Sequence, residues 1–61
     1  MQLTREQHAR LIMLANRFWR DAESPDEEAM ESLFFYLTTH NLAKLEELCE
    51  GWNINIGPEE D

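Results

Sequence analysis

The chain contains no valine, a single cysteine, only two glycines and no long apolar run. Because Cys49 is alone, no internal disulfide is possible, and the lack of a cysteine framework is typical of a reducing compartment. Gly51 and Gly57 stand near the C-terminus, so no glycine-rich phosphate loop exists. No stretch has the length of a signal-peptide core or a membrane-spanning helix. We therefore expect a cytoplasmic chain that does not bind membranes.

The residues that usually carry catalysis or bind metals are few and scattered. His8, His40 and Cys49 occur singly, whereas metal sites need several such ligands at short spacing. Cys49 has the position of a small buried hydrophobe, and the flanking Glu46 and Glu50 disfavour a reactive thiolate. We expect no metal, no cofactor and no enzymatic activity.

The short length limits stability. A chain of 61 residues removes only about 60% of its unfolded surface from water. Proteins of this size usually need a disulfide, a metal or a second subunit to support a small core. Since the first two are not expected here, the sequence predicts a homodimer.

Residues 4–22 carry the pattern of a first helix. Thr4 and Gln7 have the spacing of a capping box, which satisfies free amides at a helix start. The apolar positions that follow repeat at helical spacing. They form a stripe predicted to be buried: Leu11, Leu14, Ala15, Phe18 and Ala22, extended by His8, Ile12 and Trp19.

Residues 25–39 form a second predicted helix, with Ser24 as the N-cap and Pro25 at the first helical position. Phe35 points away from the apolar face of this helix, toward Glu28 and Glu31, so we expect it to be exposed. The residues predicted to share the buried face are Ala29, Met30, Leu33, Phe34, Tyr36 and Leu37.

A third helix is predicted over residues 42–50, capped by Asn41 and ended by Gly51 in the left-handed conformation. Its apolar residues at helical spacing are Leu42, Leu45, Leu48 and Cys49. Residues 52–56 alternate between apolar and polar, as an extended segment does. This segment either lies as coil over the helices or pairs antiparallel with the same segment of a second copy.

These elements predict an all-α fold, a compact three-helix bundle with an extended C-terminal tail. Residues 1–57 form one helical domain and residues 58–61 an acidic flexible tail. Apolar side chains outside the predicted core are candidate anchors of the dimer interface. They are Met13, Phe35, Trp52, Ile54 and Ile56.

Charge is unevenly distributed along the chain. Residues 1–22 hold four arginines and two carboxylates, whereas residues 23–61 hold one lysine and eleven carboxylates. Such a field favours partners of opposite charge. The candidate partner-binding acidic surface consists of Glu27, Glu28, Glu31, Glu46, Glu47 and Glu50. The sequence thus predicts a small acidic interaction protein, such as an inhibitor, adaptor or antitoxin-like partner, that docks on a basic protein surface. Small accessory proteins of phages or mobile elements are of this type.

Two other functions compete with this interpretation. Arg10, Arg17 and Arg20 share a basic face of the first helix that would touch phosphates in a nucleic-acid-binding regulator. The net charge of −8 opposes that function, because a polyanion is repelled at long range. The acidity can also serve solubility alone, and the chain can be a structural subunit of a larger assembly.

Overall fold

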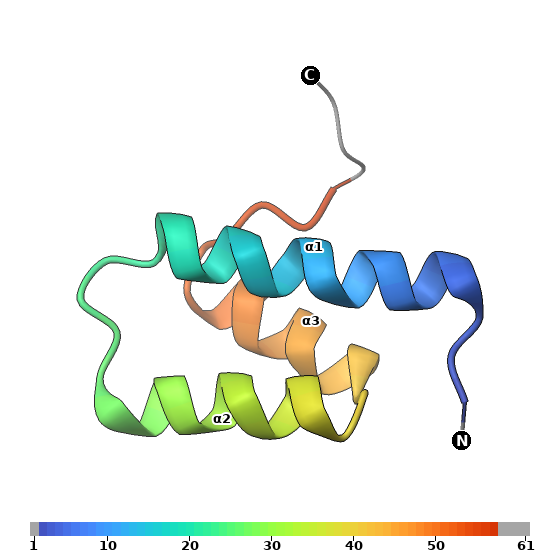
Figure 1. Ribbon diagram of the computed structural model, residues 1–61. Helices are drawn as coiled ribbons and strands as arrows, with labels where there is room; N and C mark the ends of the chain where they lie inside the picture. Colours follow the sequence, from blue (N-terminus) through green and yellow to red (C-terminus); the bar gives the residue numbers. More distant parts are fainter. Residues whose placement is uncertain (1, 58–61) are drawn as a thin grey trace.

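The computed structural model describes residues 2–57 and contains three helices (Figure 1), α1 (Arg5–Asp21), α2 (Glu27–Thr38) and α3 (Leu42–Gly51). The predicted all-α fold is confirmed, and no strand occurs within residues 2–57. α1 and α2 run antiparallel, and α3 packs against both more extensively than they pack against each other. The predicted acidic tail, residues 58–61, lies outside the described part of the chain.

The capping box predicted at the start of α1 is present. The backbone amide of Gln7 donates to the Thr4 hydroxyl at 3.0 Å, and the Thr4 amide donates to the Gln7 side-chain oxygen at 2.9 Å. These two bonds satisfy amides that the first helical turn leaves without partners. Local sequence alone therefore fixes where α1 begins.

The start of α2 differs from its prediction. Asp26, and not Ser24, is the N-cap: its carboxylate accepts a hydrogen bond from the Ala29 amide at 2.8 Å. An N-cap needs an extended backbone, which Asp26 has, whereas Ser24 has a φ of 50°. Pro25 consequently precedes the cap, and Glu27 and Glu28 occupy the first turn.

Substituting the two candidate caps separately distinguishes them. Asp26→Ala is expected to lower the free energy of unfolding by about 1 kcal/mol, because it removes the acceptor of an otherwise free helix amide. Ser24→Ala removes a hydroxyl for which the structure gives no capping bond, so its effect is expected to be smaller. Urea titration followed by circular dichroism measures both, and equal losses would contradict the assignment.

Neither α2 nor α3 uses a glycine as the left-handed residue beyond its end. After α2, His40 has a φ of 56°, and the Asn41 amide donates to the Tyr36 carbonyl at 2.9 Å. After α3, Asn53 has a φ of 61°, and the Ile54 amide donates to the Cys49 carbonyl at 2.8 Å. Each arrangement is a Schellman motif, which needs one left-handed residue just beyond the helix.

The glycine predicted to end α3 therefore does not do so. Gly51 is the last helical residue, and Asn53 supplies the left-handed position, which asparagine tolerates better than most residues. The Asn41 cap of α3 is confirmed, since its side chain accepts from the Lys44 amide at 3.2 Å. α3 thus continues past the predicted stop and carries Ile54 to the core.

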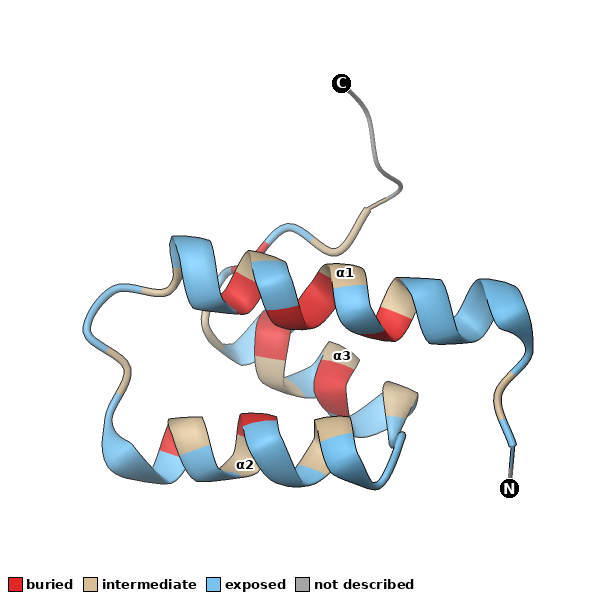
Figure 2. Cartoon of the chain, in the orientation of Figure 1, coloured by how far each residue is buried: buried red, intermediate tan, exposed pale blue. Residues whose placement is uncertain are grey.

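The core lies where α3 meets the other two helices. In Figure 2 the buried stretches of α1 and α2 are turned toward α3 and toward each other. The buried residues come from every helix and from the tail: Leu11, Leu14, Ala15, Phe18, Ala29, Leu33, Leu45, Cys49 and Ile54. The prediction was wrong for four others, because Ile12, Trp19 and Phe34 are 49%, 66% and 54% exposed and His8 is exposed as well. Helical periodicity identified the apolar side of each helix but overestimated the width that three short helices cover.

Candidate interaction surfaces

One exposed side of α2 presents an aromatic ring next to two carboxylates. Phe35 is 60% exposed, as predicted, and follows Glu28 and Glu31 by seven and four residues, so the three share one side of the helix. Both glutamates are exposed. α2 contains no lysine or arginine, and neither glutamate has an ion pair within residues 2–57. We call these three residues the α2 acidic edge.

The last turn of α2 holds Phe35 in place. The hydroxyls of Thr38 and Thr39 donate to the Phe35 carbonyl at 3.1 and 2.6 Å, and the Thr39 amide donates to the same oxygen at 3.0 Å. The Phe35 ring also meets the half-buried Tyr36 edge to face, with centroids 5.9 Å apart, a favourable arrangement for two aromatic rings. These contacts fix the backbone of Phe35 and orient its ring.

The six predicted acidic residues do not form one surface. Glu46 accepts a hydrogen bond from the Arg10 guanidinium at 2.8 Å, and Glu47 lies 3.8 Å from the Lys44 ammonium. Arg10 of α1 thus pairs with a carboxylate of α3 in the same molecule. Glu50 lies on α3, which leaves Glu27 together with the α2 acidic edge as the concentrated acidic region.

Two of the three arginines in the predicted basic face hold the C-terminal segment. Arg10 donates to the Ile56 carbonyl at 2.8 Å, and Arg17 donates to the carbonyls of Asn55 and Gly57 at 2.8 and 2.9 Å. Figure 1 shows this segment passing along α1 on the side away from α2. The arginines satisfy carbonyl groups of a chain segment that has no strand partner within residues 2–57. Sequence reasoning missed this role, because the contacts join residues far apart in the chain.

Arg20 is oriented by its neighbour. Its guanidinium makes two hydrogen bonds to the Asp21 carboxylate, at 2.8 and 3.0 Å. These bonds lower the pKa of Asp21 below its ordinary value. Arg20 nevertheless keeps most of its side chain in solvent, so it stays accessible to a second carboxylate.

The predicted interface anchors have different positions. Ile54 is buried in the core of its own chain and is not a surface residue, which corrects the prediction for it. Met13, Trp52 and Ile56 are half-buried and pack against that core. Trp52 meets Phe18 edge to face with ring centroids 5.8 Å apart. Within one copy, the described tail lies as coil over the helices.

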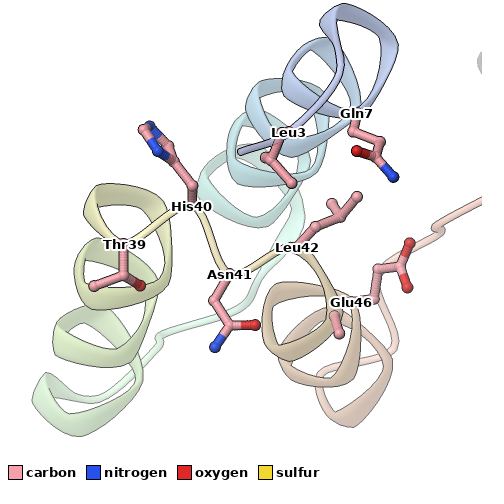
Figure 3. Close-up of a pocket in the computed structure, with 8 residues that line it drawn as sticks. Leu3, Gln7, Thr39, His40, Asn41, Leu42 and Glu46 are labelled. Carbon is pink, nitrogen blue, oxygen red and sulfur yellow. The ribbon is translucent and has the colours of Figure 1, made fainter. Parts of the chain in front are cut away.

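An open hollow lies at the junction of α2 and α3, lined by residues from the chain start, this junction and α3 (Figure 3). Four of its five polar side chains already have partners: Gln7 and Asn41 cap helices, Glu46 pairs with Arg10, and Thr39 donates to the Phe35 carbonyl. The fifth, His40, lies against the ring of His8. The fold explains the positions of these side chains, so they give no separate evidence of a ligand site.

Cys49 is buried in the core, and its thiol lies 3.7 Å from the Leu14 carbonyl oxygen as a donor. Burial, reinforced by the negative charge of Glu46, raises the pKa of the thiol to about 11. A reactive cysteine needs the opposite, an accessible and stabilised thiolate. The prediction that Cys49 is a packed core residue is confirmed.

Labelling with Ellman's reagent at about pH 8 tests the state of this thiol. We expect native Cys49 to react at least ~100-fold more slowly than the urea-unfolded chain, because its pKa lies about two units above the ordinary 9.0 and each unit is a tenfold loss of thiolate. Equal rates would contradict the burial.

The same shift predicts a pH dependence of stability. The folded chain retains the Cys49 proton at pH values where the unfolded chain loses it, so the thiol's contribution is complete below about pH 9.0 and is lost as pH rises toward about 11. A Cys49→Ala variant is expected to lack this part of the decline in urea titrations.

Among residues 2–57, no cluster of histidine, cysteine and carboxylate side chains has metal-binding geometry. No helix in the described part of the chain is both long and apolar enough to span a membrane. The fold and its surfaces define a small all-α protein with a three-helix core and an extended C-terminal segment. Comparison with protein-family models, with curated proteins and with solved structures gave no match.

Proposed function

We propose that this chain is a non-enzymatic interaction protein that docks the α2 acidic edge on a basic surface of another protein, as an inhibitor, adaptor or antitoxin-like partner. The observation that carries the proposal is the position of Phe35 next to two carboxylates that have no ion pair within the described residues. Exposed aromatic rings are frequent anchors of interfaces, and flanking charges select a partner of opposite sign and accelerate encounter. We place this interaction in the cytoplasm, where a chain without disulfides is common.

The distribution of the other charges supports a protein partner over a nucleic acid. Arg10 and Arg17 donate to tail carbonyls, so phosphate binding would compete with contacts that hold the tail. The net charge of −8 adds long-range repulsion. A gel-shift titration is accordingly expected to show no salt-sensitive shift of DNA or RNA, whereas a nucleic-acid-binding regulator would give one.

Affinity capture from an extract of the source cells, at low and at high salt, tests the proposal. The wild-type chain is expected to retain a basic protein at low salt and to lose much of it at high salt, because charge attraction between exposed groups is screened. Phe35→Ala and the pair Glu28→Gln with Glu31→Gln are each expected to reduce retention at least ~10-fold, the effect of losing about 1.4 kcal/mol of binding free energy.

Glu47→Gln with Glu50→Gln is the matched control, because it removes the same two charges from exposed glutamates of α3. It is expected to retain the partner nearly as well as wild type. If no protein is retained at low salt, or if this α3 variant impairs retention as much as the edge variants do, the proposal fails.

A further inference from the structure

Apart from the α2 acidic edge, exposed apolar side chains also lie on the side of α2 that is nearer to α1. Ile12 and Trp19 are seven residues apart and share one side of α1. Arg10 and Arg17, which hold the tail, lie on the opposite side of the same helix. The exposed side chains of Ile12 and Trp19 are therefore turned away from the tail and toward the α2 side of the molecule.

α2 contributes the other half of this surface. Glu28, Ala29 and Ser32 line a hollow with Leu48 and Trp52 of α3 and the tail, which identifies the side of α2 that faces α3 and places Glu28 of the α2 acidic edge next to it. Met30, Phe34 and Leu37 lie on a different side, at helical spacing from one another. Met30 and Leu37 are half-buried against the core, whereas Phe34 is exposed. We call the five residues Ile12, Trp19, Met30, Phe34 and Leu37 the α1–α2 face.

A contact near the ends of α1 and α2 gives the register of the two helices. The rings of His8 and His40 lie 5.2 Å apart, at the start of α1 and just beyond the end of α2. Positions along the antiparallel pair follow from this contact: Trp19 is level with the first half of α2 and Ile12 with its last turns. The apolar side chains of the two helices therefore occupy one continuous face.

Charges border this face with opposite sign on its two sides. Arg20 lies beside Trp19 on α1, with most of its side chain in solvent. Glu27, exposed, precedes Phe34 by seven residues on the outer side of α2. Consider a second copy related to the first by a two-fold axis that runs parallel to α1 and α2. The α1 helix of each copy then lies over the α2 helix of the other. This arrangement brings Arg20 of one copy to Glu27 of the other. Such a surface is complementary to itself, as a two-fold interface requires.

The molecule is flat enough to offer a broad side to a second copy. Its extents are 31 × 28 × 14 Å, so α1, α2 and α3 form a flat body with broad sides. A standard interface covers roughly 800 Å² on each partner, which a side of these dimensions provides. The small core gives a reason to use it, because a chain of this size usually needs additional burial.

The geometry points to a symmetric homodimer in which the α1–α2 face packs on the same face of a second copy. α1 and α2 of both copies form an antiparallel four-helix core, in which helix pairs bury apolar stripes from both chains. α3 and the α2 acidic edge remain on the outside. This interface differs from the anchors predicted from sequence and does not depend on the proposed docking function.

Sedimentation equilibrium of the full chain tests the dimer. Wild type is expected to have twice the chain mass of 7.3 kDa, and Trp19→Glu and Phe34→Glu are each expected to raise the dissociation constant at least ~100-fold, the size of a hot-spot loss. Both sites are exposed in one copy, so circular dichroism should show unchanged helix content. Phe35→Glu is the matched control, because it adds the same charge at an exposed ring outside the face, and it should remain dimeric.

The charge pair gives an independent test of the two-fold arrangement. Arg20→Glu alone should weaken the dimer at least several-fold, and adding Glu27→Arg should restore it. A wild-type mass of one copy from micromolar to millimolar concentration would overturn the inference. Dimers that persist in both Trp19→Glu and Phe34→Glu, or an Arg20→Glu variant as tight as wild type, would overturn it as well.

Discussion

Phe18→Ala is expected to leave most of the chain unfolded at room temperature. Phe18 is 0% exposed and belongs to the core that joins all three helices and the tail, so its loss removes buried area and leaves a cavity. Such changes cost ~3–5 kcal/mol. A lone core in a chain this short seldom supplies more than ~3–5 kcal/mol in total.

Circular dichroism and urea titration measure this effect, and Phe35→Ala is the matched control. The same atoms are removed, but from a ring that is 60% exposed, so the control is expected to fold with a loss well below that of Phe18→Ala. Trp52 reports on the same site, because its ring packs on Phe18. A folded Phe18→Ala variant, or equal losses for the two substitutions, would contradict the described core.

Ile54→Ala is expected to produce the second-largest loss, about 2–3 kcal/mol of unfolding free energy, which is the lower part of the range for buried isoleucine. Ile54 is 5% exposed and follows the left-handed Asn53, so the Schellman motif directs it back against the helices. A loss of this size would show that the tail is part of the folded domain.

Ile12→Ala removes the same atoms at a position that is 49% exposed. Measured at a concentration low enough for single copies, it is expected to lower the unfolding free energy by less than half as much as Ile54→Ala. Comparable losses would show that Ile54 packs no more tightly than a surface residue. The tail would then contribute little to stability.

The elements themselves could be predicted because their signals are local. The Thr4 and Gln7 capping box and the Asn41 cap need only residues within one turn, and each is present as predicted. The exact helix ends were harder to predict from the sequence. Ser24 and Asp26 are both good caps by type, and choosing between them requires the backbone angle at each position.

How far each side of a helix is buried depends on the elements that pack against it, and helical periodicity does not identify those elements. Phe34 and Trp19 lie at the margins of apolar stripes, and whether a margin is covered depends on how many helices pack around it. The roles of Arg10 and Arg17 were hidden for a related reason. Their acceptors are tail carbonyls 38 to 46 residues away in the chain. Every residue has a backbone carbonyl, so the sequence does not indicate which of them accept.

The candidate site was only partly predictable. Phe35 and its exposure followed from the helical arrangement alone. The division of the six glutamates did not, because it depends on which carboxylates find a cation in the folded chain. The structure pairs Glu46 and Glu47, so of these six glutamates only the three on α2 and Glu50 have no ion pair within residues 2–57.

Carboxyl labelling of the captured complex tests most directly whether α2 carries recognition. A carbodiimide and an amine convert accessible glutamates to amides, and mass spectrometry reads the yield at each residue with and without the partner. We expect strong protection of Glu28 and Glu31 in the complex and little change at Glu47 and Glu50 on α3. Unchanged labelling of Glu28 and Glu31, with protection at Glu47 and Glu50, would contradict it.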